Sequence, residues 1–222
     1  TSYADFNGLP ENKSLDALKG QSQSIEINYQ KGTNQHIVIL TSDNGNLNHS
    51  YDGDWSTLDP YFSFFQIEKR KRKSNSFETK IISTLKNRQF TIGVFLKNLE
   101  EEDNAEGFIF DLNESYISNF TSIYTIDYSS LYLQYNYKIN QTANIIFNLR
   151  ADNYKNQYQS TSTELENETY NTSFDNLPLQ KKNERIYSGR LGLKLSKFHF
   201  TISRGHKAVG FNQNPYISES DT

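Results

Sequence analysis

The chain has 222 residues, a formal net charge of −3 and no cysteine. This length allows one domain or part of a larger one. The absence of cysteine excludes a disulfide framework, thiolate metal sites and cysteine nucleophiles, and the slightly acidic balance argues against nucleic acid as a partner. Fifteen tyrosines and fifteen phenylalanines beside one tryptophan are a composition that favours β-strands.

Alternation of apolar and polar residues, the pattern of a β-strand, recurs along the whole chain. In chain order it predicts strands around residues 25–30, 77–82, 90–97, 131–138, 144–152, 190–196 and 198–203. The segments 131–138 and 144–152 form the clearest pair. One face of this pair is apolar and consists of Leu131, Leu133, Tyr135, Tyr137, Ile145, Phe147, Leu149 and Ala151. The other face is polar and consists of Gln134, Asn136, Lys138, Asn144, Asn148, Arg150 and Asp152.

The connections between these strands alternate in length. Short polar turns are predicted at 31–35, 85–89, 139–142 and 196–197, and long polar loops at about 51–73, 99–122 and 157–184. An up-and-down meander has this order when its short turns lie at one end and its long loops at the other. Transmembrane barrels of the bacterial outer membrane have this layout.

A soluble antiparallel sandwich also shows alternating strands and is the main structural alternative. The segments 123–138 and 143–158, however, are longer than the roughly 5–6 residues of ordinary strands, and a barrel strand needs about 9–11 residues to cross a bilayer. Tyrosines near strand ends also suit the aromatic girdles of a membrane barrel, namely Tyr135, Tyr137, Tyr154, Tyr158 and Tyr187. No apolar run approaches the roughly 20 residues of a membrane helix. The pattern therefore favours a membrane barrel.

Five segments resemble, in order, sequence motifs in the barrel of TonB-dependent outer-membrane receptors. They are SYDGDW at 50–55, FETKIIS at 77–83, FTIGVF at 90–95, YSSLYLQYNY at 128–137 and SRGHKAVGFN at 203–212. The chain departs from the family pattern at three positions: His206 stands in place of a tyrosine, Val209 in place of a glycine and Lys80 in place of an arginine. The resemblance spans about residues 24–215.

The resemblance implies an all-β fold, a partial antiparallel up-and-down transmembrane β-barrel. Residues 1–222 would supply about eight of the roughly 22 strands of such a barrel and would form an open curved sheet by themselves. A plug domain, a TonB box and the remaining strands are expected outside this sequence. On this reading the last predicted strand directs Phe198, Phe200 and Ile202 to lipid and His199, Thr201 and Ser203 to the lumen, and the residues from Arg204 to Asn214 begin a loop on the extracellular side.

The implied function is import of a ligand across the bacterial outer membrane, most often a ferric siderophore, with haem, cobalamin or glycans as other possibilities. The implied partners are outer-membrane lipid and lipopolysaccharide, the protein's own plug domain and the TonB complex. No enzymatic activity, metal site or cofactor is expected, because no catalytic constellation emerges and the four histidines are scattered. Two alternatives stay open: a passive porin-like barrel, and a secreted soluble β-domain that binds glycans.

A basic run at 69–73 and an acidic run at 100–103 are the densest charge clusters. Alternation sends Arg70 and Arg72 to one face of a strand and Lys69, Lys71 and Lys73 to the other. The basic run must lie above the bilayer, because Lys or Arg at the bilayer midplane costs about 2–4 kcal/mol. There it would contact lipopolysaccharide or an anionic ferric chelate, unless both runs are merely solvated loops.

Two sets of residues are the candidate functional residues. On the extracellular side the candidates for ligand binding are Tyr51, Asp52, Asp54, Trp55, Arg70, Arg72, Arg204, Lys207 and Asn212. The lumen-facing set, which by the resemblance hydrates the lumen and hydrogen-bonds the plug, consists of Glu78, Lys80, Lys97, Gln134, Asn136, Arg150, Asp152, Arg190 and Lys194.

Overall fold

The computed structural model describes residues 16–52, 62–111, 114–166 and 169–205. These residues form eight strands: β1 (Asp16–Lys31), β2 (Asn34–Asp52), β3 (Phe62–Leu85), β4 (Arg88–Asp111), β5 (Glu114–Lys138), β6 (Ala143–Glu166), β7 (Thr169–Leu195) and β8 (Phe198–Arg204). In the part of the chain that the structure describes, no helix is long and apolar enough to cross a membrane.

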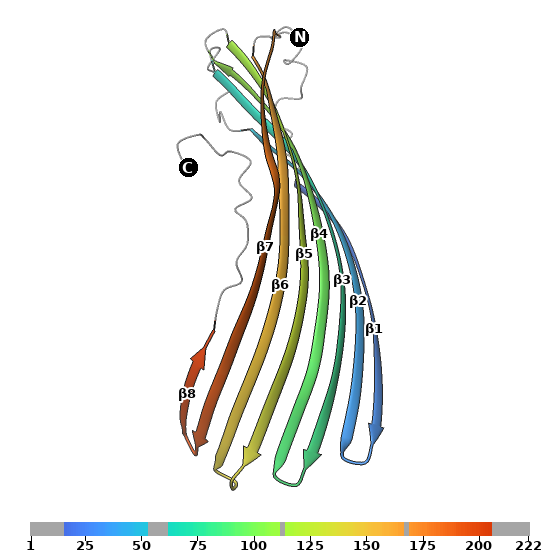
Figure 1. Ribbon diagram of the computed structural model, residues 1–222, viewed down its shortest axis with the longest axis vertical. Coiled ribbons are helices and arrows are strands. Elements are labelled where there is room, and N and C mark those ends of the chain that lie inside the picture. Colours follow the sequence, from blue (N-terminus) through green and yellow to red (C-terminus); the bar gives the residue numbers. More distant parts are fainter. Residues whose placement is uncertain (1–15, 53–61, 112–113, 167–168, 206–222) are drawn as a thin grey trace.

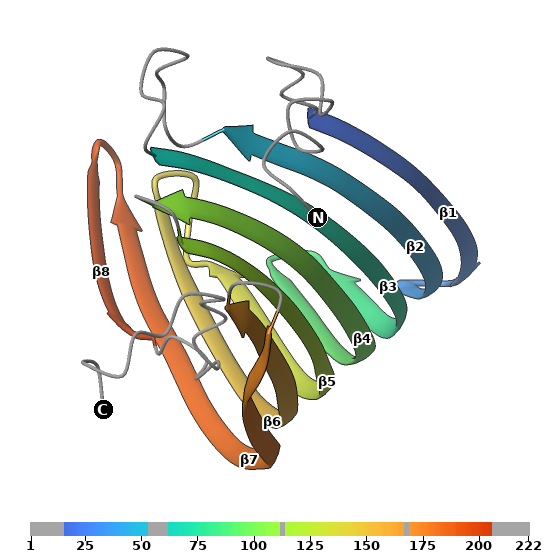
Figure 2. The same ribbon diagram turned by 90° about the horizontal axis from the view of Figure 1, so that it is seen from above.

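All eight strands belong to one sheet, in the order of the sequence, and each strand is antiparallel to the next. The sheet is open and strongly curved, with β1 at one edge and β8 at the other (Figures 1 and 2). This arrangement is an up-and-down meander, so the predicted all-β fold class is confirmed.

The four predicted short turns are also confirmed. They lie at 32–33, 86–87, 139–142 and 196–197, all at the same end of the sheet (Figure 1). Gly32 has a φ of 60°, a left-handed conformation that glycine adopts without strain. In the 139–142 turn, the Asn140 side-chain oxygen accepts hydrogen bonds from the backbone N–H groups of Thr142 and Ala143, at 2.9 and 2.8 Å.

The predicted long loops were wrong over most of their length, because the strands continue through them. β3 begins at Phe62, β4 continues to Asp111, β5 begins at Glu114, β6 continues to Glu166 and β7 begins at Thr169. The strands from β3 to β7 have 24 to 27 residues, which is about 80–90 Å at 3.3 Å per residue. These upper halves carry polar residues on both faces, so they lack the alternation that identifies a strand, while their backbones still pair.

The cross-strand register gives the sheet two chemically different faces. The convex face, called here the outer face, carries an apolar band next to the short turns. The members of this outer apolar band are Ile25, Ile27, Tyr29, Val38, Leu40, Phe77, Ile81, Phe90, Ile92, Val94, Leu96, Leu131, Leu133, Tyr135, Tyr137, Ile145, Phe147, Leu149, Leu191, Leu193, Leu195, Phe198, Phe200 and Ile202. Many of them are exposed, among them Leu191, Phe198, Phe200 and Ile202 at 53–79%. No second layer covers this face among the described residues.

The concave face, called here the inner wall, is mainly polar at the level of the band and holds most of the well-buried side chains among the described residues. Leu99 and Tyr158 are each 3% exposed there, because the curvature crowds side chains on this face. Tyr154 and Tyr158 also lie on the inner wall, opposite Glu184 and Gln180 of β7. Their predicted place in an outer aromatic girdle was therefore wrong, whereas Tyr135, Tyr137 and Tyr187 are on the outer face.

Candidate functional site

The polar inner wall unites the whole predicted lumen-facing set on one face. The register aligns Lys80, Gly93, Tyr132 and Arg150 in one row across β3 to β6. Neighbouring rows hold the rest of the set, namely Glu78, Lys97, Gln134, Asn136, Asp152, Arg190 and Lys194. The prediction that these residues share a face is confirmed, and the wall is the candidate functional site.

A tyrosine crosses one strand of this wall to reach the next. The Tyr132 ring of β5 lies over Gly93 of β4, and its hydroxyl donates a hydrogen bond to Glu78 Oε1 of β3. The Lys80 ammonium lies 3.4 Å from the same carboxylate oxygen. A Cβ atom at position 93 would collide with the ring of Tyr132. Gly93 thus has a packing role, since only hydrogen in place of a side chain leaves room for the ring.

An arginine cluster continues the wall on β5 and β6. Arg150 Nε lies 2.8 Å from Asp152 Oδ1, and Arg150 also donates a hydrogen bond to the Tyr128 hydroxyl. That hydroxyl donates to Asp152 Oδ1 at 2.6 Å, and the Tyr128 ring stacks on Tyr154 with 4.5 Å between ring centroids. The guanidinium charge is therefore neutralised within the wall, and the cluster is a rigid polar surface rather than a free cation.

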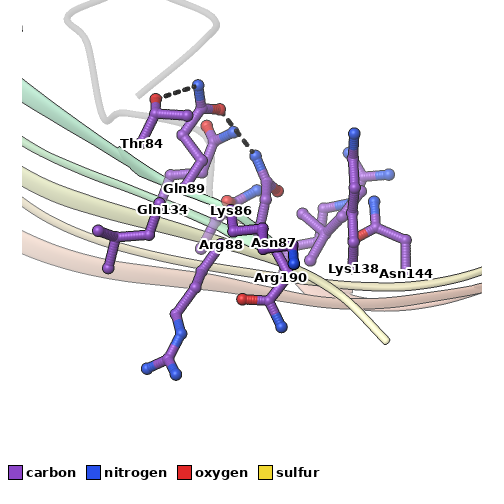
Figure 3. A pocket seen from close by; sticks show the side chains of 13 residues that line it. Thr84, Lys86, Asn87, Arg88, Gln89, Gln134, Lys138, Asn144 and Arg190 are labelled. Atoms are coloured by element: carbon purple, nitrogen blue, oxygen red, sulfur yellow. Dashed lines mark hydrogen bonds between the residues drawn. The ribbon is translucent and has the colours of Figure 1, made fainter. Parts of the chain in front are cut away.

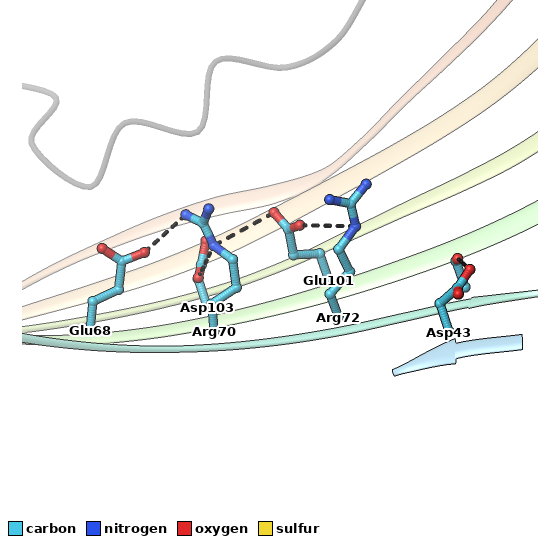
Figure 4. A network of polar contacts seen from close by, with 7 residues as sticks. Asp43, Glu68, Arg70, Arg72, Glu101 and Asp103 are labelled. Atoms are coloured by element: carbon cyan, nitrogen blue, oxygen red, sulfur yellow. Dashed lines mark hydrogen bonds and ion pairs between the residues drawn. The ribbon is translucent and has the colours of Figure 1, made fainter. Parts of the chain in front are cut away.

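A charged ladder lies higher on the inner wall, away from the short turns (Figure 4). The register places Arg70 opposite Asp103 and Arg72 opposite Glu101. Arg70 Nε lies 2.7 Å from Asp103 Oδ1, and Arg70 also lies 2.9 Å from Glu68 and 3.8 Å from Glu101. Arg72 lies 3.8 Å from Glu101. The hydrogen bond from Arg70 to Asp103 raises the pKa of the guanidinium, so the arginine stays charged.

The ladder changes the interpretation of the basic run at 69–73 and the acidic run at 100–103. The basic run of β3 and the acidic run of β4 lie opposite each other on paired strands, so neither run is a loop. Asp103 is only 6% exposed, and each ion pair stabilises the sheet by about 0.3–1 kcal/mol, because Arg70 and Arg72 are partly solvated. Arg70 and Arg72 thus stand together as predicted, but their charges are already balanced by carboxylates of the wall.

An open pocket of about 470 Å³ lies at the other end of the wall, beside the turns (Figure 3). Amide side chains and a cation line it, among them Gln134, Asn136, Asn144, Asn148 and Arg190. The amide oxygens of Asn136, Asn144 and Asn148 are buried and accept no hydrogen bond from the described residues. Such atoms require donors, so this part of the wall is suited to contact another polar surface.

The other predicted ligand-binding residues are less informative. Tyr51 and Asp52 end β2, and their side chains lie outside the described residues, as do Asp54, Trp55, Lys207 and Asn212 in full. Arg204 ends β8 on the outer face, opposite Gly189, so it is in a strand rather than in a loop and does not join Arg70. Within the described ranges, no group of His, Asp or Glu side chains could hold a metal ion.

Sequence reasoning missed the crossing of Gly93 by Tyr132 and the stack of Tyr128 on Tyr154. One signal was present, because a glycine inside a strand often marks a close approach of another group. The partner of such a glycine depends on cross-strand register, which alternation alone does not specify.

Comparison with known proteins supports the fold. The structure is similar to that of the ferric yersiniabactin uptake receptor FyuA from Yersinia pestis, with a TM-score of 0.51 and 14% sequence identity. The similarity covers 82% of this chain and 27% of the receptor, so the chain spans about a quarter of the receptor's length. No protein-family model and no curated protein matches the sequence. At this identity the likeness concerns the fold alone: an up-and-down sheet of the kind that forms a receptor barrel.

Proposed function

We propose that this chain forms part of the β-barrel of a TonB-dependent outer-membrane receptor, which imports a ligand by active transport. The observation that carries the proposal is the single-layer sheet with an exposed apolar band outside and a polar wall inside. No described residue covers this exposed apolar band. The hydrocarbon core of a lipid bilayer would cover it, as it covers the apolar band of other outer-membrane barrels.

The dimensions of the band support a membrane setting. On β3 the band and its lower neighbours extend from Phe77 to Leu85, about 26 Å of strand at 3.3 Å per residue. With the tilt of about 40° that membrane strands adopt, this length spans roughly 20 Å, near the ~25 Å apolar belt of outer-membrane barrels. If the sheet is oriented like other outer-membrane barrels, the short turns face the periplasm and the upper halves of the strands extend outside the cell.

The polar inner wall favours a receptor whose barrel holds a plug domain, rather than a barrel with an empty pore. The unpartnered amide oxygens of Asn136, Asn144 and Asn148 offer hydrogen-bond acceptors to a plug domain at the periplasmic end. The TonB complex would act through that plug. A ferric siderophore is the proposed ligand, and it would meet Arg70 and Arg72 already paired with carboxylates. Contact with an anionic ligand at this level therefore requires those ion pairs to open.

The test is uptake of labelled ferric siderophores by cells that carry or lack the gene, each with and without a working TonB system. Uptake that needs both the gene and TonB supports the proposal. Uptake that persists without TonB indicates the passive porin-like alternative. Recovery of the complete protein from the soluble fraction without detergent indicates the secreted β-domain. Haem, cobalamin and glycan uptake are measured in the same strains to identify the ligand class.

A further inference from the structure

We infer that the turn end of the sheet binds an acidic peptide segment of a partner protein, in a hollow lined by Lys86, Lys138, Lys194 and Lys197. This hollow is called here the rim pocket. The inference goes beyond the proposed function, which assigns no partner to the turns. It takes from that proposal only the expectation that this end of the sheet faces the periplasm.

Charge is distributed unevenly between the two ends of the sheet. The four hairpin ends contain twelve lysines and arginines and no aspartate or glutamate, although acidic residues outnumber basic ones in the whole chain; these ends are residues 27–42, 79–99, 128–151 and 185–204. None of the four lysines of the rim pocket forms an ion pair with another described residue. The turn end therefore carries a positive field that no carboxylate balances locally, and such a field attracts anionic partners.

The rim pocket is an open hollow of about 990 Å³, and no carboxylate of the described residues lines it. The register places Lys138 of β5, Asn144 of β6 and Lys194 of β7 in one row on the inner wall. Lys86 and Lys197 belong to the turns on either side of this row. All four lysines are exposed, so their ammonium groups are accessible to a partner.

Backbone hydrogen bonds hold the turns of the rim pocket in a fixed relation to one another. The Lys138 N–H donates to the Asn87 carbonyl at 2.8 Å, which joins the turn at 86–87 to the end of β5. The Ser196 N–H donates to the Thr142 carbonyl at 2.6 Å, which joins the turn at 196–197 to the turn at 139–142. The backbone of the pocket is therefore arranged before a partner binds, and binding has to order only side chains.

The length of the rim pocket indicates that its occupant is a chain rather than a small anion. Four strand spacings of about 4.8 Å separate the turn that carries Lys86 from the turn that carries Lys197, which is about 19 Å. A single carboxylate or phosphate can contact only neighbouring lysines of such a row. An extended peptide of about six residues spans the same length, at about 3.3 Å per residue.

The amide groups of the rim pocket favour a peptide over other polyanions. Asn87, Gln141 and Asn144 line the pocket between the lysines, and the Asn144 side-chain oxygen accepts no hydrogen bond from the described residues. A peptide backbone offers N–H donors to such an oxygen, whereas a phosphate polymer offers none. A bilayer lipid is excluded as the occupant, because Lys138 and Lys194 lie on the inner wall, opposite to the apolar band.

The experiment measures peptide binding by fluorescence anisotropy, with the full-length protein in nanodiscs of uncharged phosphatidylcholine. The probe is a fluorescein-labelled peptide of alternating glutamate and alanine, and its analogue with glutamine in place of glutamate is the uncharged comparison. The acidic peptide should bind and the glutamine peptide should not. The variant K86Q/K138Q/K194Q/K197Q should bind the acidic peptide about 10- to 100-fold more weakly, because several exposed ion pairs of modest strength are lost together. The single variant K194Q should show a smaller loss in the same direction.

A matched control removes the same charge far from the turns. K69Q/K71Q/K73Q/K155Q alters four exposed lysines of the outer face and should leave peptide binding within twofold. Equal binding by the two quadruple variants, or equal binding of the glutamine peptide, would overturn the inference. Tighter binding of a polyphosphate of the same charge would overturn the choice of a peptide. If the wild-type protein is recovered without a membrane, the proposed function is refuted, and the same variants are then compared in buffer, where binding indifferent to the rim lysines refutes this inference as well.

Discussion

Replacement of Gly93 by alanine should destabilise the sheet because of one defined collision. The new methyl group would occupy the space of the Tyr132 ring, so the ring must move and its hydrogen bond to Glu78 must break. Overpacking costs about 1–3 kcal/mol, and a hydrogen bond to a charged group contributes about 1.5–3 kcal/mol. Since the site is only half-buried, we expect Gly93→Ala to lower the free energy of unfolding by about 2–4 kcal/mol.

The measurement is urea unfolding of the protein in phospholipid vesicles, followed by far-UV circular dichroism. Gly45→Ala is the matched control: Gly45 also lies on the inner wall within a strand, but a Cβ there meets nothing within 4 Å. That variant should be neutral or more stable by about 0.5–1 kcal/mol, because alanine loses less backbone entropy on folding. With Tyr132→Ala in the background, Gly93→Ala should likewise lose its penalty. An equal penalty with and without the tyrosine ring would refute the reasoning.

Two further predictions test the faces and the ladder. Leu133→Arg, in the middle of the outer apolar band, should lower the free energy of unfolding in vesicles by about 2–4 kcal/mol. Gln134→Arg, one residue along the same strand on the inner wall, should change it little. Equal effects of the two variants would contradict the assignment of faces. Arg70→Gln and Asp103→Asn should each lower the free energy of unfolding by about 1 kcal/mol, and the double variant should lose less than the sum, because each single change leaves a partner uncompensated. Strict additivity in that cycle, measured by urea unfolding at low salt, would show that the two side chains do not interact.

Much of the lower half of the sheet followed from local pattern. The faces of the lower parts of β5 and β6, at 131–138 and 144–152, were predicted correctly, because side chains of a strand alternate with a period of two whatever the strand pairs with. All four short turns were predicted for a similar reason, since polar residues interrupt the alternation there. The lumen-facing set could be named from the same pattern, with Gln134 and Arg150 on the face opposite to Leu133.

The upper half and the contacts of the candidate site could not be predicted in this way. Segments such as 100–106 and 180–184 carry charged or amide side chains on both faces, so they have no apolar period, and they were taken for loops. They form strands because their backbones hydrogen-bond to the neighbouring strands. Such hydrogen bonds produce no residue pattern within one segment of the sequence. The pairing of Arg70 with Asp103 likewise joins residues 33 positions apart.

The sequence by itself therefore determined which side chains share a face and where the chain reverses direction in short turns. It also determined that one face of the sheet is apolar and needs apolar surroundings. These properties depend on the geometry of a single extended chain. Only the tertiary structure decided how far the strands extend, which charges balance one another and that the Tyr132 ring crosses Gly93. These depend on register, in which a shift of one residue would send every side chain to the opposite face.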